Sequence, residues 1–97
     1  MKTNLEYPYK RTMELMEGSP NSSYLDFYMS ENPIAWEYLS YNGVIKEVEY
    51  CIEKFTCEGW DAYESIQNGC KETMQELKEL RQVLKFLKNK VKTMGVK

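Results

Sequence analysis

The chain has 97 residues, of which 42% are hydrophobic and 29% charged, and its formal net charge is −2. This composition is typical of one small globular domain and excludes an intrinsically disordered chain. No apolar run approaches the roughly 20 residues that a membrane-spanning helix needs, and the N-terminus, MKTNLEYPYK, lacks the apolar stretch of a signal peptide. We therefore expect a cytoplasmic protein without a membrane partner.

The residues that usually carry catalysis are scarce. Histidine, the commonest general base and zinc ligand, is absent from the sequence, and no GxSxG, P-loop or glycine-rich phosphate loop is present. The three cysteines, Cys51, Cys57 and Cys70, show no CxxC spacing, so we expect reduced thiols buried in a core. The sequence predicts no enzyme, no cofactor and no metal site.

Two short helices are predicted within the first 31 residues. The segment KRTMELMEG favours a helix of about 9–17 that Gly18 ends, and Ser22 or Ser23 can cap a second helix, YLDFYMSE. Both are too short to be stable alone, so we expect them to pack on the rest of the chain.

A longer helix is predicted from about 33 to 57. Asn32 suits an N-cap and Pro33 the first helical position. A hairpin at Asn42-Gly43 would require strands with alternating apolar and polar residues on both sides, and VIKEVEYCIEKF does not alternate in this way. The helix is therefore either continuous or broken at 42–43. The apolar positions recur four and three residues apart: Ile34, Tyr38, Tyr41, Ile45, Val48, Ile52 and Phe55.

The C-terminal third carries the longest helical pattern. Its spacing passes through Asn68-Gly69 without changing phase, whereas a turn would reset it. Gly59 can close the preceding helix and Asp61 can cap the next, so a turn is predicted at 58–60 and one helix from about 61 to 94, with a weak point at Asn68-Gly69. The members of this coiled-coil-like pattern are Tyr63, Ile66, Cys70, Thr73, Leu77, Leu80, Leu84, Leu87, Val91 and Met94.

The predicted fold is all-α, a single domain over 1–97. Residues 32–97 form a helical hairpin, a long antiparallel pair of about 33–57 and 61–94, and 1–31 supply the short helices and loops packed on it. The second helix is longer than the first by about nine residues, or roughly 13 Å, and its end therefore extends beyond the first helix as an overhang. Either the N-terminal helices cover this overhang or a second copy does, and we expect a homodimer. Its predicted interface consists of Leu80, Leu84, Phe86, Leu87, Val91 and Met94.

Charge is segregated along the chain. Residues 1–80 hold fifteen acidic and seven basic residues, a charge of −8, whereas residues 81–97 hold six basic residues and no acid, a charge of +6. Several of the basic residues fall three and four positions apart and so share one helix face beside the apolar one. We call them the basic stripe: Lys78, Arg81, Lys85, Lys88 and Lys92.

The basic stripe favours an anionic partner, and the alternative is a plain solvated helix face. Candidates are acids of the chain itself or of a second copy, an acidic partner protein, and nucleic acid. The acidic body would repel phosphates, so protein is favoured over nucleic acid. Within one chain, an antiparallel arrangement would bring Lys85, Lys88 and Lys92 near acids of the N-terminal part. Those acids are Glu14, Glu17, Asp26, Glu31 and Glu37.

Aromatic residues are concentrated between 24 and 63, where ten of the thirteen lie. Tyr38, Tyr41 and Phe55 fit a core, whereas Trp36, Tyr50 and Trp60 fall off the apolar pattern and are candidate contacts to a partner. The sequence thus favours a small protein-interaction factor such as an inhibitor, adaptor or regulator. Eleven Lys against two Arg, with only two Ala, is typical of an AT-rich genome, so a phage of a low-GC bacterium is a plausible source. The alternatives are a binder of a small anionic ligand or nucleotide, and a nucleic-acid-binding dimer that uses the basic C-terminal helix.

Overall fold

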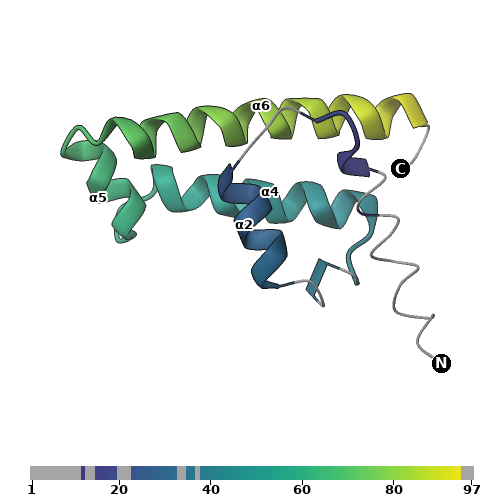
Figure 1. Ribbon diagram of the computed structural model, residues 1–97, viewed down its shortest axis with the longest axis horizontal. Helices are drawn as coiled ribbons and strands as arrows, with labels where there is room; N and C mark the ends of the chain where they lie inside the picture. The colour runs from purple at the N-terminus through teal and green to yellow at the C-terminus, as the bar shows by residue number, and fades with distance from the viewer. Residues whose placement is uncertain (1–11, 13–14, 20–22, 33–34, 37, 95–97) are drawn as a thin grey trace.

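The computed structural model describes residues 12, 15–19, 23–32, 35–36 and 38–94, and the described elements are helices. They are α2 (Ser23–Glu31), α4 (Tyr41–Thr56), α5 (Asp61–Gln67) and α6 (Lys71–Met94). Figure 1 shows α4 and α6 running antiparallel side by side, with α2 packed across the pair and α5 joining its two members at one end. The predicted all-α fold with a long antiparallel helix pair is confirmed.

The first long helix begins later than predicted. The predicted start at Pro33 lies outside the described residues, and Ala35 and Trp36 are helical, but the chain is not helical at 38–40 and α4 starts at Tyr41. The cause is Ser40, whose hydroxyl accepts a hydrogen bond of 3.0 Å from the backbone N–H of Gly43. This N-cap sets the helix start and places Asn42-Gly43 in its first turn. A continuous helix from 33 to 57 is therefore wrong.

The second long helix is divided at Asn68-Gly69, so the predicted continuous helix over 61–94 is also wrong. Gly69 has a φ of +85°, the left-handed conformation that glycine adopts without steric cost. The N–H of Cys70 donates to the carbonyl of Ser65 at 3.0 Å, and the N–H of Gly69 donates to that of Ile66 at 2.9 Å. These two bonds form a Schellman motif, which satisfies the last carbonyls of α5 and ends that helix.

The turn predicted at 58–60 is confirmed. Gly59 has a φ of +99°, and α4 ends at Thr56 just before it. The predicted N-cap is displaced by one residue, because Trp60 occupies that position without a side-chain hydrogen bond and Asp61 is the first residue of α5. An acid there still complements the helix dipole. Gly18, with a φ of +84°, follows the helical residues Leu15 and Met16, in keeping with the predicted end of the first short helix.

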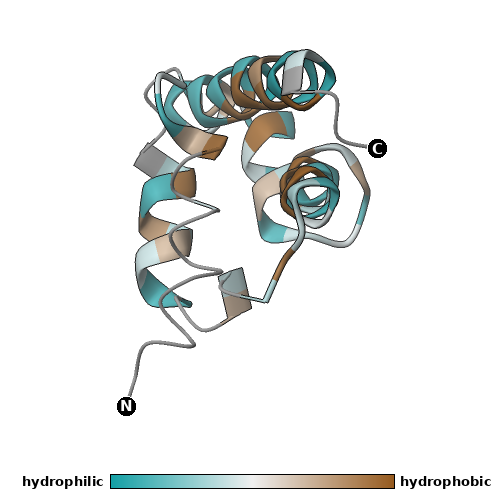
Figure 2. Cartoon of the chain, turned by 90° about the vertical axis from the view of Figure 1, so that its right-hand side faces the viewer, coloured by the Kyte–Doolittle hydropathy of each residue, from teal (hydrophilic) through white to brown (hydrophobic). Residues whose placement is uncertain are grey.

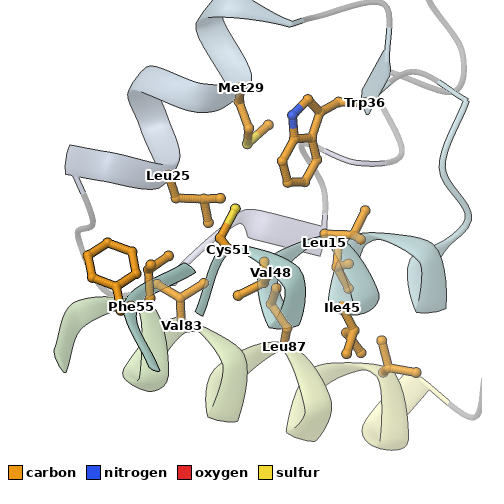
Figure 3. Close-up of a cluster of buried hydrophobic side chains, with 13 residues drawn as sticks. Leu15, Leu25, Met29, Trp36, Ile45, Val48, Cys51, Phe55, Val83 and Leu87 are labelled. Atoms are coloured by element: carbon orange, nitrogen blue, oxygen red, sulfur yellow. The ribbon is translucent and has the colours of Figure 1, made fainter. Parts of the chain in front are cut away.

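The core lies where α2, α4 and α6 meet, and the chain before α2 contributes to it. In Figure 2 the hydrophobic stretches of α4 and α6 face inward, and in Figure 3 Leu25 of α2 approaches Cys51 of α4 while Met29 points toward Trp36. Thr12, buried with them, donates its hydroxyl to the carbonyl of Trp36 at 3.0 Å, so its polar group is satisfied. The buried cluster is Leu15, Leu25, Met29, Trp36, Val44, Ile45, Val48, Cys51, Phe55, Leu80, Val83, Leu87 and Val91.

The short helix α5 is attached to this core by one face. Ala62 and Ile66, four positions apart, are partly buried against the core cluster. Within the residues that the structure describes, no helix is both long enough and apolar enough to cross a membrane.

Candidate protein-interaction face on the C-terminal helix

Helix α6 presents two faces of different chemistry. Leu80, Val83 and Leu87 are fully buried against the rest of the chain. The five residues of the basic stripe are all exposed. The 3.6-residue period separates these faces, and the charges follow the helix dipole, with Glu72 in the first turn and Lys92 in the last. The stripe therefore lies on one accessible side of α6.

The stripe is only partly neutralised within the chain. The Nζ atom of Lys88 lies 3.3 Å from Oε2 of Glu49 on α4, an exposed ion pair worth about 0–1 kcal/mol. The other four members, Lys78, Arg81, Lys85 and Lys92, form no salt bridge with the described part of the chain. Four cations on one face are therefore available to a partner.

The described acids that were expected beside the stripe, Glu17, Asp26 and Glu31, form no salt bridge with it. Lys88 pairs with an acid of α4 rather than with Glu17, Asp26 or Glu31, because α4 is the direct antiparallel neighbour of α6. Glu14 and Glu37 lie outside the described residues. Lys90, which is not a stripe member, approaches the N-terminal segment by donating to the backbone carbonyl of Glu17 at 2.8 Å.

Three members of the stripe, Lys78, Arg81 and Lys85, border a hollow of about 330 Å³. This volume is near the lower limit of about 300 Å³ for ligand pockets. Met74 is 42% exposed and, with the partly buried Leu77, supplies apolar surface between the cations. This hollow combines an apolar surface with three positive charges. Its described lining residues all come from α6: Met74, Leu77, Lys78, Arg81, Gln82 and Lys85.

The acids of α6 lie on a different side. Glu72, Glu76 and Glu79 are four and three positions apart, and Glu79 is two positions from Arg81, nearly opposite around the helix. Burial, and then the neighbouring carboxylates of Glu72 and Glu79, raise the pKa of Glu76. These acids therefore do not neutralise the cations of the hollow.

Most of the predicted dimer interface is buried in the single chain. Leu80 and Leu87 are fully buried and Val91 is 6% exposed. Leu84 and Phe86 are partly buried against the same core, and the side chain of Met94 lies outside the described part. Residues 15–19 approach this end of α6, where Gly18 faces the ring of Phe86. Among the described members of the predicted interface, Leu84 and Phe86 are the ones that keep exposed area for a second copy.

The aromatic candidates separate into core and surface. The prediction of a core position is right for Phe55 and wrong for Tyr38, which is 66% exposed. Trp36 is 1% exposed and packs edge-on against Tyr28, so it is a core residue. Tyr50 and Trp60 are 44% and 38% exposed, and their rings are perpendicular with centroids 6.2 Å apart. These two rings remain accessible to a partner.

Lys54 is a residue that the sequence analysis missed. Its Nζ atom lies 5.0 Å from the ring centroid of Tyr50 and 5.4 Å from those of Trp60 and Tyr28, within the range of cation–π attraction. Tyr28 in turn donates its hydroxyl to Glu47 at 3.4 Å, and burial followed by this carboxylate raises its pKa. The four-residue spacing of Tyr50 and Lys54 could have indicated part of this cluster, but only the fold adds Tyr28.

No group of three or more potential metal ligands is found among the described residues. No protein-family profile, no curated protein and no solved structure matches this chain. The description of this chain therefore depends on its own structure, a small all-α protein in which α6 presents a cationic, partly apolar face.

Proposed function

We propose that this chain is a small cytoplasmic protein-interaction factor, an inhibitor, adaptor or regulator, that binds an acidic partner protein through the basic stripe of α6. A phage origin is consistent with its amino-acid usage. The function proposed is binding rather than catalysis. The observation that carries it is that four of five stripe cations have no salt bridge to the described chain.

Electrostatics favours a protein partner over nucleic acid. Like-charged neighbours such as Arg81 and Lys85 repel each other along the helix, and an anionic partner relieves this repulsion. The body of the chain carries −8, which repels a polyphosphate passing beside it. Single-stranded nucleic acids are usually held by cations interleaved with aromatic rings, whereas the neutral residues in the described lining of the hollow are Met74, Leu77 and Gln82.

The test compares two variants with an equal change of charge. Lys78→Gln/Lys85→Gln removes two stripe cations, and Lys46→Glu changes the charge by the same two units at an exposed lysine of α4. Each tagged protein is used to capture partners from lysate of a low-GC bacterium, at low and high salt, with identification by mass spectrometry. We expect one acidic protein to be captured by wild type and by the control variant, and to be lost with the stripe variant.

Two other measurements address the alternatives. A gel shift of DNA or RNA at physiological salt by wild type, lost in the stripe variant, would replace this proposal with a nucleic-acid-binding function. A rise in melting temperature with nucleotides would support a small anionic ligand instead.

A further inference from the structure

The hollow on α6 has the two components of a helix-binding surface. Met74 and Leu77 supply apolar area, and Met74 is 42% exposed although it is one of the larger apolar side chains of the chain. Methionine adapts its shape to different apolar partners, which suits a contact surface. An apolar surface bordered by cations is complementary to a ligand that carries both apolar and acidic side chains.

The cations have a spacing that a helix can match. Lys78, Arg81 and Lys85 are three and four positions apart, so they cover about 10 Å along the axis of α6. Carboxylates three and four residues apart on a second helix cover the same distance. Arg81 can hold one of them with two parallel hydrogen bonds, which also sets the direction of approach.

The rest of the molecule restricts where such a helix can bind. A second hollow of about 340 Å³ has the described lining Glu17, Phe86, Asn89, Lys90 and Thr93, and among these Lys90 already donates to the carbonyl of Glu17. Over residues 1–73, which precede the hollow of Met74 and Lys78, thirteen acidic and six basic residues give a charge of −7, which disfavours an acidic ligand there. Charge complementarity therefore selects the face of Met74, Lys78, Arg81 and Lys85.

We infer that the segment bound by this face is an acidic amphipathic helix of the partner. Its apolar side chains cover Met74 and Leu77, and its carboxylates pair with Lys78, Arg81 and Lys85. This inference rests on the proposed function and adds the shape and chemistry of the partner segment.

The probe is a synthetic peptide of about 18 residues, long enough to be helical, with leucines on one face and glutamates flanking them at three- and four-residue spacing. One control peptide has the same composition in scrambled order, and another has glutamine in place of glutamate. Binding to the full chain is measured by fluorescence anisotropy at 50 and 300 mM salt. We expect the amphipathic peptide to bind at least about tenfold tighter than either control, and more weakly at high salt.

Variants of the chain locate the site. Lys78→Gln/Lys85→Gln should weaken peptide binding about tenfold and Met74→Ser about fivefold, whereas Lys46→Glu, with an equal change of charge on α4, should leave it unchanged. Circular dichroism confirms that each variant is folded. Equal affinity for the amphipathic and scrambled peptides, or no binding by either, would overturn the inference. So would preferential binding of a single-stranded DNA of equal charge.

The two proposals can fail separately. If protein capture depends on Lys78 and Lys85 but the amphipathic peptide binds no better than the scrambled one, the partner is bound in another form and only the helix inference is wrong. If neither capture nor peptide binding depends on the stripe, both proposals are wrong.

Discussion

The three cysteines occupy three different environments. Cys51 is fully buried in the core, Cys57 is exposed after the end of α4, and Cys70 is partly exposed at the start of α6. The expectation of buried core thiols is therefore right for Cys51 and wrong for Cys57. Burial raises the pKa of Cys51 to about 11, whereas the hydroxyl of Thr73, 3.2 Å from the sulfur, and backbone N–H groups of α6 lower the pKa of Cys70.

This difference predicts the order in which the thiols react. The thiolate is the nucleophile, and a lowered pKa supplies it at lower pH, so Cys70 should be alkylated by iodoacetamide at a pH where an ordinary thiol is still protonated. Cys51 should stay unmodified until the chain unfolds. Peptide mapping by mass spectrometry across pH 6–9 checks both expectations, and labelling of Cys51 ahead of Cys70 in the folded chain would contradict them.

Lys54 connects three elements at a single residue. Its ammonium lies against Tyr28 of α2, Tyr50 of α4 and Trp60 before α5. Lys54→Met keeps the aliphatic stem but removes the charge, so it should lower the free energy of unfolding by about 1 kcal/mol. Lys46→Met, at an exposed position of the same helix, is the matched control and should change stability by less than about 0.5 kcal/mol. If the two variants lower the free energy of unfolding equally in urea denaturation, the contact of Lys54 with the rings does not stabilise the chain.

At the scale of elements, the division between α5 and α6 depends on Gly69. An ideal Cβ built there has no atom within 4 Å, so a side chain meets no steric obstacle and only the positive φ resists substitution. Gly69→Ala should therefore destabilise the chain by about 1 kcal/mol. Gly69→Asn is the control and should cost less, because asparagine tolerates the left-handed conformation. Stabilisation by alanine in a thermal melt would mean that α5 and α6 join into one helix in solution.

At the scale of the whole molecule, the apolar end of α6 serves the fold of one chain. Leu87 is fully buried, so Leu87→Asp should cost at least about 3 kcal/mol and should do so at every protein concentration. Asn89→Asp introduces the same carboxylate at an exposed position of the same helix and should be nearly neutral. The predicted homodimer would behave differently. The melting temperature of the wild-type chain would rise with protein concentration, and light scattering would give twice the mass of one chain.

Several properties of this chain could be predicted from the order of residue types alone. Periodic apolar residues predicted helices and the antiparallel pair, and Gly59 predicted the turn between them. The basic stripe followed from the spacing of Lys78, Arg81 and Lys85, because exposed charges on a helix need only the 3.6-residue period to be placed. These are local properties, and tertiary contacts reinforce them.

The positions of the helix breaks, and the segments that cover the apolar helix faces, could not be predicted without the folded structure. Apolar periodicity shows which side of a helix is buried but not the direction of the helix axis. The apolar spacing therefore continues across Gly69, because α5 and α6 are separate helices that pack against the same core. The Ser40 cap and the Schellman motif each contribute on the order of 1 kcal/mol, a small local preference that packing can support or override. Likewise, Trp36 is buried because α2 folds over it, a contact between distant segments that no spacing along the chain encodes.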